Sequence, residues 1–251
     1  MSLYFLLACP VVPEDVDSSD TSSPGDTADS GDTATDDGDV ANDVLVEVAV
    51  ADRSEGFDLD GDGRVDNALW YTKNLVDPLI EERLLYASNV AVLQLSGIDG
   101  WTDDAVRVGL FNAVDADGDG ADNASGDEVV EAGAAVDGDG LALVGVPTGL
   151  VGGAYEVELG TNELLIGTFE FELATGVFVS AVATPDGQSG LIGGAISTEA
   201  FEAALDATEA DGEVIEAALN HADLDLDGNG ENDALSMAFE FSAAPVLLSS
   251  P

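Results

Sequence analysis

From residue 43 onward, apolar residues alternate with polar or small residues in short runs. In the first run, residues 44–50, every second residue is a valine. A period of two is typical of a half-buried strand whose apolar side chains share one face. Turns rich in Gly, Pro and Asp separate most runs, which predicts a mainly β chain, either an antiparallel β-sandwich or a barrel-like domain. The other predicted strands are residues 90–95, 106–110, 141–146, 155–159, 169–173, 177–183, 191–197 and 237–241.

Two short helical insertions interrupt the β pattern. The first covers residues 67–73 and 78–86, and we predict that Asp77 caps its second piece, with Pro78 at the first helical position. The second covers residues 198–208 and 212–220, where apolar residues recur at helical spacing.

Residues 10–42 consist mainly of Asp, Ser, Thr, Gly and Ala, with no basic or aromatic residue. Such a segment cannot bury enough apolar surface to offset its ordering entropy, and its carboxylates repel one another. We expect residues 9–42 to be a disordered acidic tether. The rest of the chain, residues 43–251, is expected to form a single domain, because sandwiches and barrels of this length are common as one unit.

The charge balance narrows the range of partners. The chain has 251 residues, with 5 Lys and Arg against 52 Asp and Glu, for a formal net charge of −47. Nucleic acid is excluded, because phosphate binding needs clustered basic side chains. Either bound cations neutralise part of this charge or a salty medium screens it, and both can hold. Because 45% of the residues are apolar, a core is still expected.

Three acidic strings place carboxylates at alternate positions, followed by a Gly that permits a sharp turn. Calcium, which takes six to eight oxygen ligands, needs such an arrangement. We predict up to three calcium ions, in loop 1 (residues 58–67), loop 2 (residues 115–123) and loop 3 (residues 225–233). The candidate ligands are Asp58, Asp60, Asp62, the Arg64 carbonyl and Asp66 in loop 1, Asp115, Asp117, Asp119 and Asp122 in loop 2, and Asp225, Asp227, Asn229 and Asp233 in loop 3.

These loops resemble the Asp-x-Asp-x-Asp-Gly loops of EF-hands, dockerins and thrombospondin type 3 repeats. The resemblance is incomplete in loop 1, where Leu69 stands at the position of the bidentate Glu of an EF-hand. The closing ligand must then come from elsewhere; the candidates are Asp77, Glu81 and Asp103 for loop 1, and Asp127 and Glu128 for loop 2.

A solvated acidic turn is the alternative for every loop, since Asp and Gly are ordinary turn residues. We favour that alternative for the short string at residues 137–140. A transition metal is not expected, because His221 and Cys9 are the chain's single His and Cys. Loops 1 and 3 both run into an Ala-Leu pair, which suggests related elements.

Residues 4–9, Tyr-Phe-Leu-Leu-Ala-Cys, resemble the lipobox of bacterial lipoproteins. The resemblance implies a signal peptide over residues 1–8, a lipid on Cys9 that anchors the chain to a membrane, and a place at the outer membrane or cell surface, since Pro10 rather than Asp follows Cys9. The segment before Cys9 is shorter and less basic than a signal peptide, which a start codon assigned too late would explain. Without the anchor, a secreted protein is expected.

Signals for catalysis are weak. His221 has no partner nucleophile in a recognisable motif, and the chain contains no nucleophile elbow, Walker loop or zinc helix. We therefore expect no catalytic residue, and favour a surface-anchored calcium-binding lipoprotein with a structural or ligand-binding role.

The alternative is a secreted carbohydrate-active hydrolase with structural calcium, since 52 acids supply many carboxylate pairs. A calcium-buffering or matrix protein is a third class. A cell-surface glycan or protein is the candidate ligand; Trp70, Tyr71 and Trp101 could stack on a sugar, although packing of Trp70 and Tyr71 against the sheet is favoured. The sequence leaves the oligomeric state open.

Overall fold

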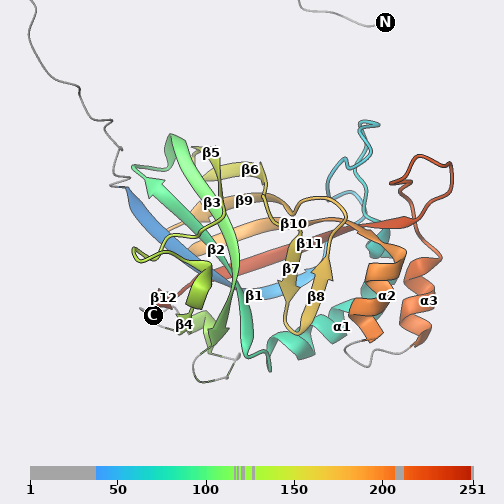
Figure 1. Ribbon diagram of the computed structural model, residues 1–251, viewed down its shortest axis with the longest axis horizontal. Helices are drawn as coiled ribbons and strands as arrows, with labels where there is room; N and C mark the ends of the chain where they lie inside the picture. Colours follow the sequence, from blue (N-terminus) through green and yellow to red (C-terminus); the bar gives the residue numbers. More distant parts are fainter. Residues whose placement is uncertain are drawn as a thin grey trace, which may run out of the picture. The chain divides into compact units, whose positions relative to one another are not determined.

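The computed structural model describes residues 38–115, 117, 119, 122–125, 128–206 and 212–249. Its main feature is an antiparallel sheet of eight strands that closes into a barrel, because β3 pairs with β5 as well as with β2 (Figure 1). The predicted mainly β class is confirmed, in its barrel-like form. In ring order the strands are β3 (Thr102–Asp115), β2 (Asn89–Ile98), β1 (Asp39–Val50), β11 (Ala234–Pro245), β10 (Gly187–Ser197), β9 (Phe178–Thr184), β6 (Ala154–Glu158) and β5 (Gly145–Val151).

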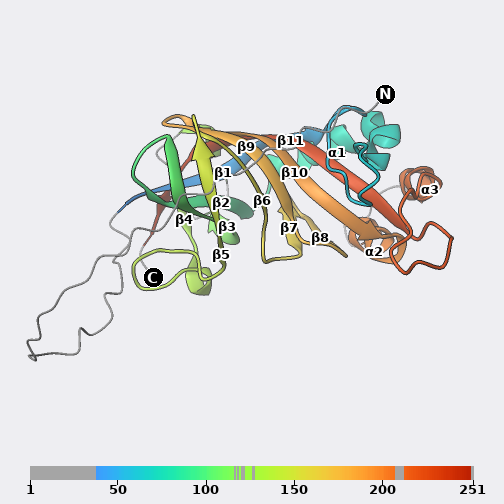
Figure 2. The same cartoon turned by 90° about the horizontal axis from the view of Figure 1, so that it is seen from above.

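The remaining elements cover parts of the barrel. Figures 1 and 2 show the three α-helices towards one end of the sheet and β4 and β12 towards the other. None of the helices in the described part of the chain is both long and apolar enough to cross a bilayer. These elements are η1 (Ala68–Thr72), α1 (Lys73–Leu84), η2 (Asn123–Ser125), β4 (Val129–Glu131), η3 (Gly133–Ala135), β7 (Glu163–Ile166), β8 (Phe169–Glu172), α2 (Thr198–Asp206), α3 (Gly212–Leu219) and β12 (Leu247–Leu248).

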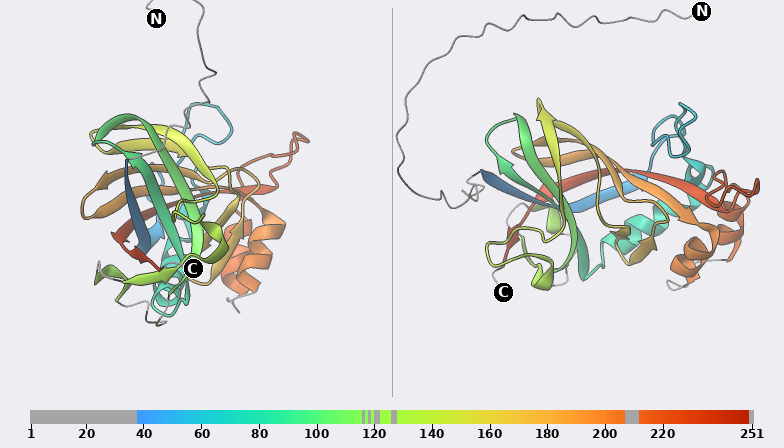
Figure 3. Two further views of the ribbon diagram at one scale, coloured as in Figure 1. Left: turned by 60° about the vertical axis from the view of Figure 1, so that its left-hand side comes forward. Right: turned by 45° about the horizontal axis from the view of Figure 1, so that its top comes forward.

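The main apolar core fills the barrel interior and continues beneath the β7–β8 hairpin and the helices. The strands curve around this interior in the left-hand view of Figure 3. The Phe171 ring of β8 stacks on three other buried phenylalanines: Phe169 at 5.8 Å between ring centroids, Phe239 at 6.1 Å and Phe201 at 6.5 Å. These four rings join the hairpin, α2 and β11 into one packed unit.

Strand β1 buries both of its faces. Its pairing with β11 shifts register between Leu45 and Glu47, so that Val46 is the extra residue of a β-bulge. Val44 and Val46 therefore pack on the outside of the barrel, whereas Val48 and Val50 belong to the main core. The prediction that the alternating valines share one face is wrong, because the bulge changes the face in mid-strand.

A buried polar network lies on the core side of the barrel wall. The Tyr155 hydroxyl donates to Gln188 Oε1 at 2.5 Å, and Gln188 Nε2 donates to Asp43 Oδ2 at 2.6 Å. All three side chains are buried. Burial raises the pKa of the Asp43 carboxyl and also that of the Tyr155 hydroxyl. Ionisation of Asp43 inside the fold therefore costs stability.

The first helical insertion is continuous, since η1 leads directly into α1. The prediction that Asp77 caps a helix beginning at Pro78 is wrong, because α1 begins at Lys73 and Pro78 lies inside it. The Asp77 carboxylate instead accepts a hydrogen bond from the Val50 backbone N–H at 2.7 Å and lies 3.1 Å from the Lys73 ammonium. Asp77 therefore fastens α1 to the end of β1. The second insertion is confirmed as α2 and α3.

The predicted strand at residues 141–146 is also wrong, because β5 begins at Gly145. Leu143 and Val144 are 62% and 53% exposed and lie in a turn, where the Leu143 N–H donates to the Ala135 carbonyl at 3.0 Å. Cys9, most of the predicted tether and Asp127 lie outside the described residues.

Candidate metal centres

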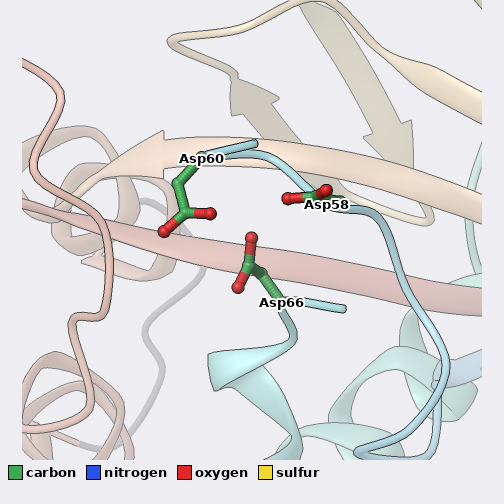
Figure 4. A group of neighbouring side chains, drawn as sticks. All are labelled: Asp58, Asp60 and Asp66. Atoms are coloured by element: carbon green, nitrogen blue, oxygen red, sulfur yellow. The ribbon is translucent and has the colours of Figure 1, made fainter. Parts of the chain in front are cut away.

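Loop 1 brings three carboxylates together. Carboxyl oxygens of Asp58, Asp60 and Asp66 lie within 4.8 Å of one another, and Figure 4 shows the three side chains directed toward a common centre. Asp58 and Asp60 are exposed, and Asp66 is half-buried. Oxygens at this spacing suit a hard cation. Loop 1 can therefore hold a metal ion.

The local hydrogen bonds explain why loop 1 folds this way, and loop 3 repeats them. In each loop the last Asp accepts from the backbone N–H of the second residue, and the first Asp accepts from the sixth. The pairs are Asp66 with Leu59 (2.9 Å) and Asp58 with Gly63 (2.9 Å) in loop 1, and Asp233 with Leu226 (2.9 Å) and Asp225 with Gly230 (2.7 Å) in loop 3.

Glycine is required at the turn of both loops. Gly63 has φ +84° and Gly230 has φ +92°, a left-handed conformation that side chains rarely adopt. A Cβ atom at either position would meet nothing within 4 Å, so the backbone angle and not the available space sets the requirement. The predicted relation between loops 1 and 3 holds for the loops themselves, although η1 follows loop 1 and β11 follows loop 3.

The two loops differ in electrostatics. Burial raises the pKa of the Asp66 carboxyl, and the neighbouring Asp60 and Asp223 carboxylates raise it further. In loop 3, backbone N–H groups, first that of Gly230, lower the pKa of Asp225. Asp225, Asp227 and Asp233 do not form a converging triad among the described residues. The carboxylates of loop 1 thus repel one another. In loop 3, by contrast, three backbone N–H groups already donate hydrogen bonds to the first carboxylate, Asp225.

Loop 2 contributes the second converging group, formed by Asp115, Asp117 and Glu128. The ladder between β3 and β4 explains this group, because Asp115 pairs with Val130 and so brings the start of β4 next to the end of β3. Of the two closing ligands proposed from the sequence, Glu128 is the one that the structure places beside Asp115. Asp122 lies within reach of the Asp115, Asp117 and Asp119 charges, which raise its pKa after the larger effect of desolvation.

Several predicted ligands of loop 1 have other partners. The Asp62 carboxylate accepts from the Arg64 backbone N–H at 2.8 Å and lies 3.9 Å from the Arg64 guanidinium. Of the closing candidates, Asp77 holds α1 against β1, and Asp103 accepts from the backbone N–H groups of Asp99 and Ala105.

Glu81 lines a groove beside α1, away from loop 1. The acid that approaches loop 1 from outside is Asp223, which precedes loop 3. Because Asp223 lies far from loop 1 in the sequence, a local pattern could not identify it as a neighbour of Asp66. The right-hand view of Figure 3 shows loops 1 and 3 at the same end of the barrel.

The short string at residues 137–140 is a tight turn. Asp137 Oδ1 accepts from the backbone N–H groups of Asp139 at 2.9 Å and Leu141 at 3.0 Å. The geometry agrees with the solvated acidic turn predicted for this string.

The exposed aromatic residues do not form one platform. Tyr71 is 47% exposed and stacks on the His221 ring, with 4.2 Å between centroids, while the Arg53 guanidinium lies 5.3 Å from the Tyr71 ring centre. Trp101 lies in the turn between β2 and β3 and makes no ring contact with Trp70 or Tyr71 in the described structure. Because His221 and Arg53 both lie against Tyr71, this ring offers little face for a sugar.

A groove of about 650 Å³ runs between α1 and the outer face of β1 and β11. Glu47 and Glu240 line its barrel side, and Asp77 and Glu81 line its helix side. A hydrogen bond with the Glu55 carboxyl raises the pKa of Glu240. No Trp or Tyr is among the described residues that line this groove, so it lacks the aromatic surface of a sugar-binding cleft.

Comparison with protein-family models, with curated proteins and with solved structures gave no match to this chain. A function for this chain must therefore be inferred from the two acidic groups and their surroundings.

Proposed function

We propose that this protein is a calcium-stabilised β-barrel protein anchored at the cell surface by a lipid on Cys9, with a structural or ligand-binding role. The observation that carries the proposal is the convergence of Asp58, Asp60 and Asp66 in a loop whose backbone is fixed by its own carboxylates. Oxygen-only donors of this kind select calcium over zinc or copper.

Calcium has a structural role in this proposal, because the ions offset the repulsion of a chain that carries −47 charges. Extracellular sites of this type have dissociation constants of roughly 10⁻⁴–10⁻³ M. With free calcium tenfold above that constant, each ion stabilises the fold by about 1.4 kcal/mol. Two or three ions then supply a sizeable part of the stability of a typical domain.

Calorimetric titration of the full chain with calcium tests the metal part of the proposal. We expect binding at loops 1 and 2, and weaker binding at loop 3. Replacing Asp58 and Asp60 together by Asn removes one site, and replacing Asp115 and Asp117 by Asn removes another. The matched control is Asp137→Asn with Asp139→Asn, which leaves the titration unchanged. A wild-type chain that takes up no calcium at millimolar concentration contradicts the proposal.

The anchor is tested separately. Expressed in a bacterium that matures lipoproteins, the full chain is expected to incorporate a labelled fatty acid, and the Cys9→Ala variant is not. A wild-type chain that incorporates none refutes the anchor and leaves the calcium sites unaffected.

A further inference from the structure

We infer that the ion at loop 2 is a clamp that holds strands β4 and β12, here called the outer flap, against the barrel. This inference rests on the proposed calcium binding and adds a ligand and a consequence to it. The proposed ligands are Asp115 at the end of β3, Asp117 two residues after it, Asn123 from η2, and Glu128 from the position before β4.

Asn123 supplies the observation that does not depend on the acidic cluster. Its side chain is 3% exposed, and its Oδ1 atom accepts no hydrogen bond from any described residue. A buried oxygen without a donor costs about 1–3 kcal/mol, and binding of an ion is one way in which such an atom is satisfied. Asn67 Oδ1, beside Asp66 of loop 1, is likewise buried without a donor. Each converging triad thus has a buried amide oxygen close to it in the chain.

Chain position and the hydrogen bonds of loop 2 connect Asn123 to the triad. The preceding residue, Asp122, donates its backbone N–H to the Asp119 carbonyl at 3.1 Å. Asn123 is the ninth residue of loop 2, the position at which Asp66 of loop 1 converges with Asp58 and Asp60. Loop 2 also repeats one hydrogen bond of loop 1. The Asp119 N–H donates to Asp117 Oδ1 at 2.8 Å, and at the equivalent positions of loop 1 the Asp62 N–H donates to Asp60 Oδ1 at 2.9 Å. We therefore place the amide oxygen on the ion.

The outer flap is attached to the barrel by few hydrogen bonds. β4 pairs with β3 at two positions, Val114 with Glu131 and Asp115 with Val130, and β12 pairs only with β4 in the described sheet. The Leu247 N–H donates to the Glu128 carbonyl at 2.8 Å, so the residue that would bind the ion also holds β12. An ion joining Glu128 to Asp115 would therefore fix both strands of the flap.

The flap covers apolar surface on the outside of the barrel. This outer cluster is separate from the main core and consists of Val44, Val90, Val92, Phe111, Ala113, Val130, Ala132 and Val246. Val130 of β4 is fully buried in it, and Leu248 of β12 packs against it. Loss of the ion is thus expected to loosen the flap and expose the outer cluster, while the main core, which does not include these residues, stays folded.

Hydrogen exchange of the full chain, followed by mass spectrometry with calcium or with chelator, tests the clamp. We expect calcium to slow exchange in residues 128–131 and 246–249 about tenfold or more, the scale on which loss of a group supporting a metal site changes affinity. Asn123→Ala and Glu128→Gln should abolish this slowing, whereas Asn123→Asp keeps an oxygen ligand and should retain it. Asp58→Asn, the control in loop 1, should leave the calcium effect on the flap unchanged.

The clamp would be overturned if calcium slows hydrogen exchange in the flap equally in the wild type, in Asn123→Ala and in Glu128→Gln. The clamp would also be overturned if calorimetry finds loop 2 occupied while calcium leaves hydrogen exchange in the wild-type flap unchanged. In that case the proposed calcium binding would stand without the clamp. A chain that binds no calcium at all fails the proposed function as well, so the two failures are distinguishable.

Discussion

The hydroxyl of Ser236 donates a hydrogen bond to Asp223 Oδ2 at 2.6 Å. Ser236 lies fully buried on β11, and its Oγ also accepts from the Ala68 backbone N–H at 2.7 Å. Ala68 follows loop 1 and Asp223 precedes loop 3. One hydroxyl group therefore connects the two loops and holds the Asp223 carboxylate near Asp66.

We predict that Ser236→Ala destabilises the protein by about 1–3 kcal/mol, because it leaves the buried Ala68 N–H without an acceptor. Urea denaturation of the full chain measures this loss. Ser242→Ala is the matched control, since Ser242 lies on the same strand but is only half-buried. Equal stability of the two variants would show that the hydroxyl bridge contributes little.

Phe171 is predicted to be a central packing residue, because its ring contacts those of Phe169, Phe201 and Phe239. Phe171→Ala should cost about 3–5 kcal/mol, through lost burial and the cavity that remains. Val151→Ala, at a side chain 75% exposed, should change stability by no more than about 0.5 kcal/mol. A small effect of Phe171→Ala on the thermal midpoint would mean that the hairpin is not part of the cooperative core.

Asp43 is predicted to make stability depend on pH in the direction opposite to that of a salt-bridged acid. Because burial raises its pKa in the folded state, its contribution is most favourable below the ordinary Asp pKa and is lost as the pH rises through the raised folded value. Asp43→Asn keeps an oxygen acceptor for Gln188 and carries no charge. It should stabilise the protein at pH 7 by about 1 kcal/mol.

The measurement for Asp43 is the difference in unfolding free energy between wild type and Asp43→Asn at pH 7 and pH 4. The other carboxylates are the same in both proteins, so their contributions to the pH dependence cancel in this difference. We expect the advantage of the variant to shrink at pH 4. An advantage that grows on acidification would contradict the assigned direction of the pKa.

The sequence pattern predicted elements well where they depend on local spacing. The alternation in β3, β6 and β8 predicted strands, and the Asp-Gly spacing of loop 1 identified Asp58, Asp60 and Asp66 as neighbours. Features set by distant pairing could not be predicted. The β3–β5 pairs close the barrel, the bulge at Val46 depends on β11, and Asp223 reaches loop 1 through Ser236.

Pro78 shows the limit of a local rule. Proline is favoured at the first helical position, and an Asp before it suggests a cap. In the structure the Asp77 carboxylate is occupied by the Val50 N–H and by Lys73, and η1 has already started the helical segment. A tertiary contact with β1 thus overrides the preference of the Asp-Pro pair.

The thermal midpoint of the full chain with millimolar calcium, compared with the midpoint in excess chelator, tests the central claim most directly. If each ion adds about 1.4 kcal/mol, two ions raise the midpoint by roughly 5–10 °C for a domain of this size. The Asp58→Asn and Asp60→Asn double variant should lose about half of that rise, and magnesium should not replace calcium. A midpoint that calcium leaves unchanged would contradict the account.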